Sequence, residues 1–92
     1  MRNQNKPYDI EDRLVRFAGE IILFTKTFNK DDAGFYLRDQ LTRSACAAAL
    51  NYGETQGAES SQDTQHKIEL VIKELKESRV SLKISDYLKM AI

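Results

Sequence analysis

The stretch from Gln40 to Glu59 constrains the fold of this 92-residue chain more than any other segment. Cys46 lies within it among five small residues, which are Ser44, Ala45, Ala47, Ala48 and Ala49. Alanine is the best helix former, and nothing before Gly53 interrupts a helix. Small side chains on several faces let neighbouring backbones approach from more than one side. We therefore expect this segment to be the central helix of a bundle.

Composition predicts one small domain covering residues 1–92. Lys and Arg together number 14, as do Asp and Glu, so the total charge favours neither nucleic acid nor a membrane surface. A single cysteine cannot form an intrachain disulfide, and no Cys/His group has zinc-ligand spacing, so neither a metal nor a cofactor is expected. The polar start precedes no apolar signal region, and no apolar run is long enough to span a membrane, which predicts a cytoplasmic protein.

Two helices are predicted in the first half of the chain. Apolar residues recur at alternating spacings of four and three after an Asp9 cap, as in a packing seam: Ile10, Leu14, Phe17, Ile21, Phe24 and Phe28. Residues 29–32 form the turn, where Asp31 or Asp32 can cap the next helix. That second helix is expected over residues 33–52.

A third helix is predicted to start near Ser60, because Ser60 and Asp63 have the spacing of a capping box. Its expected inner face consists of Ile68, Val71, Ile72, Leu75 and Leu82. Residues 1–7 are expected to be a flexible tail.

The end of the chain predicts the start of a fourth helix over residues 86–92. Ser85 and Asp86 resemble a new cap, and the apolar residues Leu88, Ala91 and Ile92 follow at helical spacing. The predicted fold is therefore all-α, an antiparallel up-down bundle of three helices plus the start of a fourth. Its unfinished apolar stripe indicates a shortened fourth helix or a face covered by another subunit.

Asn51 and Glu54 are the main polar candidates, since residues three apart share one helix face. In a functional interpretation they line a cleft, with Glu54 as a general base. In a structural one, Glu54 accepts backbone N–H groups or pairs with Arg43 or Arg79. We favour the structural role, because no second acid or histidine is tied to Glu54 by its spacing. We therefore expect no catalytic residue and no enzyme activity.

The remaining reactive side chains have unexceptional surroundings in the sequence. Cys46 among alanines favours an inert buried thiol over a nucleophile. His66 has one acid, Asp63, on its face, which is too few ligands for a metal, so a solvated or capping histidine is expected.

Basic side chains on all three helices are candidate nucleic-acid contacts. Those considered are Arg13, Arg16, Arg38, Lys73 and Lys76, with Arg43 and Lys83 nearby. A basic strip would bind phosphates without sequence preference and with strong salt dependence. Acidic residues are interleaved with these cations, however, so a mixed, solvated face is the favoured interpretation: Glu11, Asp12, Asp39, Glu74 and Glu77.

Several segments together resemble the 23S ribosomal RNA intervening-sequence protein family, also called four-helix-bundle proteins. The run Gln40-Leu41-Thr42-Arg43-Ser44-Ala45, followed by Asn51-Tyr52-Gly53-Glu54, is similar to that family's Gln-Leu-x-Arg run and Asn-x-x-Glu motif. The turn Phe28-Asn29-Lys30-Asp31 and the stretch Leu75-Lys76-Glu77-Ser78 also resemble family segments. Thr55 stands where the commonest form of the motif has glycine, and the family's fourth helix is nearly absent.

The resemblance implies an up-down four-helix bundle that assembles into rings, typically pentamers. It implies no established activity for most members. A related bundle protein partners a reverse transcriptase and binds nucleic acid through a basic surface. We accordingly expect a homo-oligomeric, non-enzymatic interaction or scaffold protein, and alternatively a nucleic-acid-binding accessory protein with nucleic acid or a nucleic-acid enzyme as partner.

Overall fold

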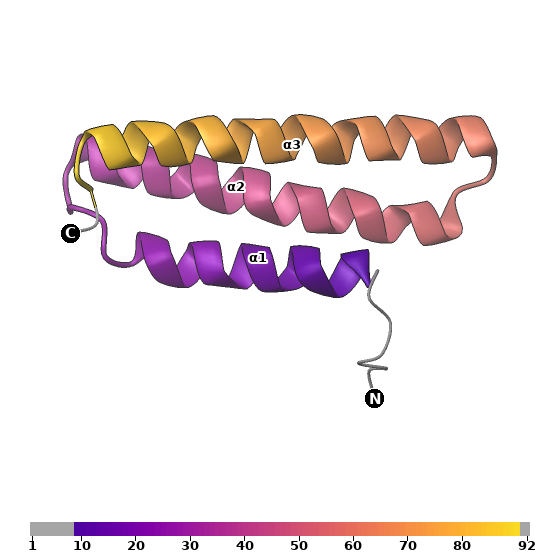
Figure 1. Cartoon of the computed structure of the whole chain (residues 1–92), viewed down its shortest axis with the longest axis horizontal. Helices are drawn as coiled ribbons and strands as arrows, with labels where there is room; N and C mark the ends of the chain where they lie inside the picture. Colours follow the sequence, from indigo (N-terminus) through magenta and orange to yellow (C-terminus); the bar gives the residue numbers. More distant parts are fainter. Residues whose placement is uncertain (1–8, 91–92) are drawn as a thin grey trace.

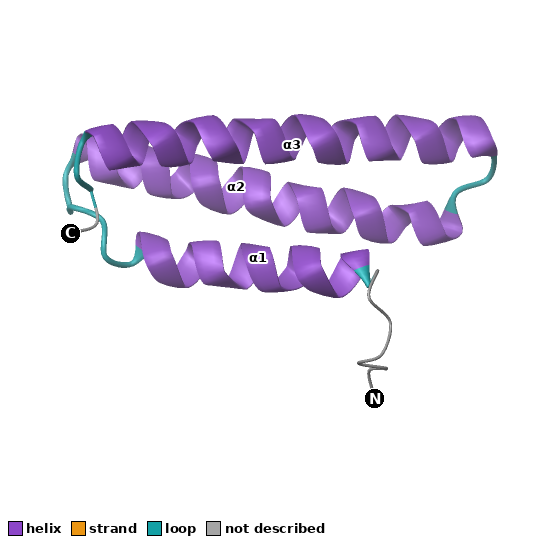
Figure 2. Cartoon of the chain, in the orientation of Figure 1, coloured by secondary structure: helices purple, strands orange, loops and turns teal. Residues whose placement is uncertain are grey.

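The computed structural model describes residues 9–90, and these residues form three α-helices and one short 3₁₀ turn (Figure 2). Helix α1 is Ile10–Thr25, α2 is Asp32–Glu54, η1 is Thr55–Gly57 and α3 is Ser61–Tyr87. The described residues contain no strand, which confirms the all-α prediction. The predicted tail of residues 1–7 lies outside the described residues.

Each helix begins at a side-chain cap that satisfies an otherwise unpaired backbone N–H. Asp9 accepts from the N–H of Asp12 at 3.2 Å, Asp31 from that of Gly34 at 2.8 Å, and Ser60 from that of Asp63 at 3.0 Å. The predicted cap at Asp9 and the predicted start at Ser60 are confirmed, and of the two caps considered for α2 the structure uses Asp31.

Helix α2 contacts both other helices, whereas no Cα atom of α1 lies within 8 Å of a Cα atom of α3 (Figure 1). The α2 residues Leu41, Ala45 and Ala48 have no exposed surface. One core cluster joins Leu41 and Ala45 to Ala18 and Ile21 of α1. A second cluster brings Ala48 together with Leu14 of α1 and Val71 of α3. The small side chains of α2 therefore act as predicted, because they let two helices pack on it at once.

The α1–α2 turn packs closely against the start of α2 at Gly34. An added Cβ at this residue would lie 1.8 Å from the carbonyl oxygen of Asn29 and 2.8 Å from its carbonyl carbon. Both are backbone atoms, so only a glycine allows this approach. Phe28, in the same turn, is buried in the core beside Ile21 and Leu37.

The predicted start of a fourth helix at Ser85 and Asp86 is wrong, because α3 continues through both residues to Tyr87. The hydroxyl of Ser85 donates to the carbonyl of Ser81, one turn earlier in the same helix, at 2.9 Å instead of capping a new one. Of the predicted segment 86–92, residues 91 and 92 lie outside the described residues.

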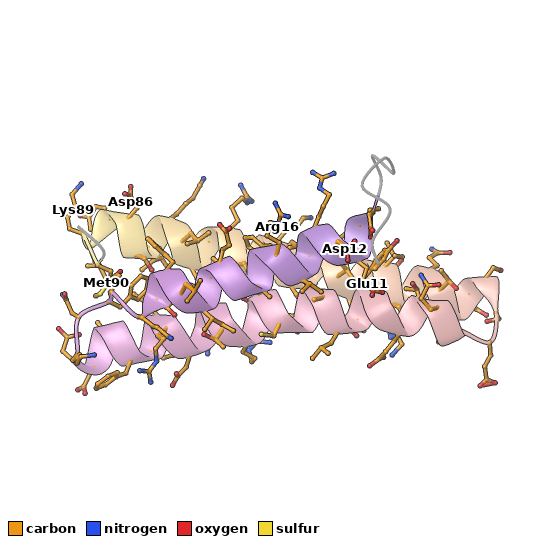
Figure 3. All side chains as sticks on the ribbon, turned by 90° about the horizontal axis from the view of Figure 1, so that it is seen from below. Glu11, Asp12, Arg16, Asp86, Lys89 and Met90 are labelled. Carbon is orange, nitrogen blue, oxygen red and sulfur yellow. The ribbon has the colours of Figure 1, made fainter. Side chains whose placement is uncertain are left out.

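Helix α3 ends in a Schellman motif, which turns the chain back toward the core. The N–H of Met90 donates to the carbonyl of Ser85 at 3.0 Å, and that of Lys89 to Asp86 at 3.1 Å. Lys89 has a φ of 56°, in the left-handed region where this motif usually has glycine. Met90 is thereby buried in the core cluster with Ile21 and Phe28. Figure 3 shows Met90 just after the end of α3.

Candidate functional site

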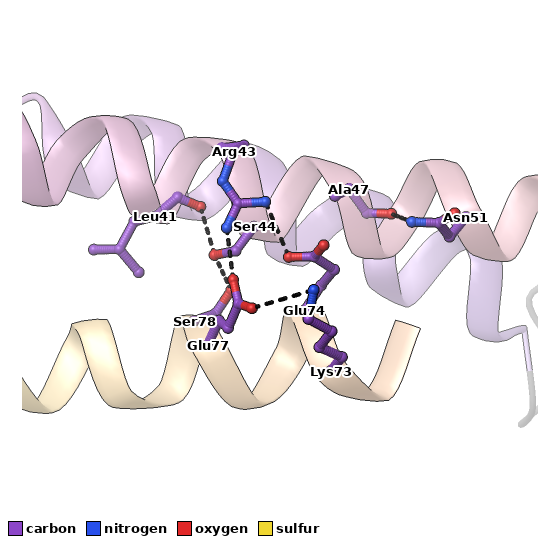
Figure 4. A network of polar contacts seen from close by, with 9 residues as sticks. All are labelled: Leu41, Arg43, Ser44, Ala47, Asn51, Lys73, Glu74, Glu77 and Ser78. Atoms are coloured by element: carbon purple, nitrogen blue, oxygen red, sulfur yellow. Dashed lines mark hydrogen bonds and ion pairs between the residues drawn. The ribbon is translucent and has the colours of Figure 1, made fainter. Parts of the chain in front are cut away.

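A buried pair of serine hydroxyls lies between α2 and α3 (Figure 4). The Oγ atoms of Ser44 and Ser78 are 2.6 Å apart, and both residues are 1% exposed. Ser44 Oγ also lies 3.4 Å from the carbonyl oxygen of Leu41. Because buried hydroxyls without partners are strongly unfavourable, this pair specifies one register of α3 against α2.

Next to this pair, Arg43 binds two carboxylates of α3 with two different nitrogens (Figure 4). Its Nη1 lies 3.2 Å from Glu74 Oε1, and its Nη2 lies 2.6 Å from Glu77 Oε1. Lys73 adds a second cation 3.7 Å from Glu77. The hydrogen bond to Glu77 raises the pKa of Arg43, and the same bond lowers the pKa of Glu77.

Glu74 is a buried acid, with 7% of its surface exposed, on the side of α3 that faces α2. The predicted inner face of the third helix does not include Glu74 or Ser78, yet both are buried, as is Ser85, which was predicted to cap a fourth helix. Among the described residues, no buried side-chain nitrogen or oxygen is left without a hydrogen bond. The arrangement is thus a satisfied polar seam, defined here as Arg43, Ser44, Glu74, Glu77 and Ser78.

The structure assigns the two motif residues Asn51 and Glu54 separate contacts. The amide of Asn51 donates to the carbonyl of Ala47 in its own helix at 2.9 Å. Glu54 has a 57% exposed side chain and accepts from Lys67 Nζ at 2.5 Å, which raises the pKa of Lys67. The predicted pairing of Glu54 with Arg43 or Arg79 is wrong, because Lys67 occupies the α3 position that faces the end of α2 and binds Glu54.

The two remaining reactive side chains lie apart from each other. Cys46 is a free, half-buried thiol packed against the core, and His66 is exposed on α3. No group of three or more His, Cys, Asp or Glu side chains with metal-binding geometry occurs between residues 9 and 90.

The five candidate nucleic-acid contacts are exposed and distributed over all three helices. Arg13 and Arg16 are on α1, Arg38 is on α2, and Lys73 and Lys76 are on α3. Arg38 is held by Asp39, with the Nε–Oδ1 distance at 3.3 Å, and Lys73 is held by Glu77. Helices α1 and α3 both pack on α2, and no Cα atom of one lies within 8 Å of a Cα atom of the other. The five cations are therefore spread over three helices and do not lie on a single pair of helices in contact.

Sequence reasoning missed the buried polar residues of α3. The available signal was the serine among the alanines of α2. A helix closely approached on two sides buries such a hydroxyl, which then requires a polar partner on the neighbouring helix. Ser78 is that partner, and it lies in the stretch that resembles the known family.

These features define a small all-α protein whose polar side chains join helices to one another. No helix within residues 9–90 is both long and apolar enough to cross a membrane. The chain belongs to the 23S rRNA-intervening sequence protein family, whose sequence model matches residues 6–91. No curated protein and no solved structure matches the chain.

Proposed function

We propose that this chain is a non-enzymatic interaction module of the cytoplasm that works as a homo-oligomer. The oligomer that we propose is a ring of five copies. Its proposed fold is an antiparallel bundle of the four-helix family. The residue order along the α2–α3 seam supports this topology, because Glu54 meets Lys67 while Ser44 meets Ser78. Higher numbers on α2 therefore face lower numbers on α3.

The observation that carries the proposal is the amount of apolar surface left exposed. Among residues 9–90, 13 large hydrophobic side chains are exposed. The four most exposed are Leu23, Tyr36, Leu50 and Tyr87, at 63–85% of their surface. All three helices contribute such residues. Where such side chains form a contiguous patch, the surface marks a protein–protein interface.

One strip of this surface is continuous along α3. Val80, Ile84 and Tyr87 are spaced by four and three residues, so they share a face of the helix. Each is at least 45% exposed. A second copy of the chain offers an equally apolar surface for this strip, as closed homo-oligomers require.

Light scattering after size-exclusion chromatography, over a range of protein and salt concentrations, tests the proposal. The expected mass is a fixed multiple of the chain mass, and for the proposed ring it is five times the chain mass. The double variant Ile84→Lys/Tyr87→Lys is expected to lower the mass, whereas Lys83→Gln, an exposed change on the same helix, leaves it unchanged. A monomer at every concentration would overturn the proposal.

A second function, sequence-independent nucleic-acid binding, is favoured by the surface of α1. Arg13 and Arg16 are one turn apart and exposed, and no acidic group of residues 9–90 forms an ion pair with either. Bound RNA or DNA should dissociate steeply with salt. Arg13→Gln/Arg16→Gln is expected to reduce the slope of log affinity against log salt by about 2. Absence of binding at low salt would exclude this function.

A further inference from the structure

A cavity of about 270 Å³ opens at the turn between α1 and α2. Its charged lining residues are all cationic: Lys26 at the end of α1, Lys30 in the turn and Arg38 on α2. Phe28 and Phe35 provide its apolar lining. Phe28 belongs to the core, but helix packing does not account for three basic groups and the exposed ring of Phe35 around one hollow.

The Arg38 guanidinium is held in position at this cavity by two contacts. It lies 5.0 Å from the ring centroid of Phe35, within the range of a cation–π interaction. Asp39 Oδ1 accepts from its Nε and Nη2, both at 3.3 Å. A guanidinium has five N–H donors, so three remain for a ligand.

The two lysines of this cavity, Lys26 and Lys30, form no ion pair with the described residues. The nearby Asp31 already accepts the Gly34 N–H as the cap of α2, so the backbone at the start of this helix is occupied. An anion in the cavity would therefore be held by side chains and not by the helix terminus.

The size of the cavity limits the ligand. It is somewhat smaller than the ~300–1,000 Å³ typical of pockets for drug-sized molecules. Lysine ammonium groups bind phosphate as point charges, and two unpaired lysines match a dianion better than a singly charged carboxylate or phosphodiester. The exposed ring of Phe35 adds an apolar surface on which a flat ring can pack.

We propose that this cavity binds a phosphate monoester attached to a planar ring. Lys26, Lys30 and Arg38 hold the phosphate, and Phe35 contacts the ring. A free nucleoside monophosphate and the 5′-phosphorylated end of a strand both present this chemistry. The proposal uses neither the apolar strip of α3 nor the arginines of α1.

Phenyl phosphate is the minimal probe, and amide NMR of the full chain gives the readout. Its addition should shift the resonances of residues 25–38, and inorganic phosphate, which lacks the ring, should bind at least threefold more weakly. Lys26→Gln/Lys30→Gln should weaken binding at least tenfold, and Phe35→Leu should abolish the preference for phenyl phosphate over inorganic phosphate. The control Arg79→Gln/Lys83→Gln carries the same charge change at exposed positions of α3 and should bind like the wild type.

The source of the ligand is distinguished by comparing a nucleoside 5′-monophosphate with a short oligonucleotide carrying or lacking a 5′-phosphate. If only the nucleoside monophosphate binds, the ligand is a free nucleotide. If the 5′-phosphorylated oligonucleotide binds as well, the ligands include the 5′-phosphorylated ends of strands. Equal binding of the oligonucleotide without its terminal phosphate would overturn the monoester assignment. Unchanged resonances of residues 25–38 at millimolar phenyl phosphate, or full binding by the double lysine variant, would overturn the site itself.

Discussion

The hydroxyl oxygens of Ser44 and Ser78 lie 2.6 Å apart in the buried interface between α2 and α3, and each serves as the other's hydrogen-bond partner. Ser44→Ala or Ser78→Ala alone is expected to lower the free energy of unfolding by ~1–3 kcal/mol. Ser44→Ala removes the partner of the buried Ser78 hydroxyl, and Ser78→Ala leaves Ser44 with only the longer contact to the Leu41 carbonyl at 3.4 Å. The double variant should lose less than the sum of the two. Urea unfolding in a double-mutant cycle measures this coupling.

Ser61→Ala, at an exposed position on α3, is the matched control and should change stability by less than ~0.5 kcal/mol. Single variants as mild as this control, or simple additivity in the double variant, would show that the hydroxyl pair does not hold the two helices in register.

Acidification should weaken the contact between Arg43 and Glu77. The hydrogen bond from Arg43 lowers the pKa of Glu77 below its ordinary value of 4.5. The folded state therefore binds the proton less readily than the unfolded state. The contact between Arg43 and Glu77 stabilises the fold fully above the pKa that Glu77 has in the unfolded chain. This stabilisation disappears as the pH falls through the lower pKa that Glu77 has in the folded state. The urea midpoint measured from about pH 7 to about pH 3 should show this loss in the wild type.

Glu77→Gln should flatten that part of the pH profile, whereas Glu69→Gln, an exposed acid on α3 that Arg43 does not contact, should leave it in place. A Glu77→Gln profile parallel to that of the wild type would rule out a role for this ion pair in acid stability.

Gly34→Ala should destabilise the fold by ~1–3 kcal/mol, because the new methyl group would collide with the backbone of Asn29. Gly19→Ala provides the contrast: nothing lies within 4 Å of the added carbon, and alanine favours a helix by ~1 kcal/mol. Thermal unfolding followed by circular dichroism should move the two midpoints in opposite directions. Midpoints that shift together would mean that the α1–α2 turn does not need its close approach.

Lys89→Gly should stabilise the protein by ~0.5–1 kcal/mol. Lys89 has a left-handed backbone, which is unfavourable for a residue with a Cβ, so glycine removes this cost. The gain is partly offset because glycine gives the unfolded chain greater freedom. Lys83→Gly, within α3, should instead destabilise by ~1 kcal/mol. Chemical denaturation of both variants checks the sign, and a destabilised Lys89→Gly would contradict the Schellman geometry.

The three helices of the structure and their starts could be predicted because the sequence signals are local. Asp9 and Ser60 each carry a side-chain oxygen at the spacing that a helix start requires, and the apolar seam has the helical period. The small residues of α2 likewise predicted two neighbours. These features depend on a few adjacent residues, so no tertiary information was needed.

The polar seam could not be predicted, because it depends on which side chains meet across two helices. Periodicity treats Glu74 and Ser78 as outward residues and Ile72 as inward. In the structure the first two are buried, and Ile72 is 47% exposed. Glu74 and Ser78 can be buried despite their polarity, because Arg43 pairs with Glu74 and Ser44 bonds to Ser78. The turn at Lys89 was missed for a related reason, since lysine gives no signal for a left-handed conformation.

The three helices are not held together in the same way. Hydroxyl and guanidinium contacts join α3 to α2, and these have direction, so displacement by one helical turn would break all of them together. Helix α1 lies on α2 through Leu14, Ala18 and Ile21, whose contacts change only gradually as the helices slide. The α2–α3 pair is therefore the stiff half of the molecule, and amide hydrogen exchange should be fastest in α1, the helix that an incoming partner can most readily displace.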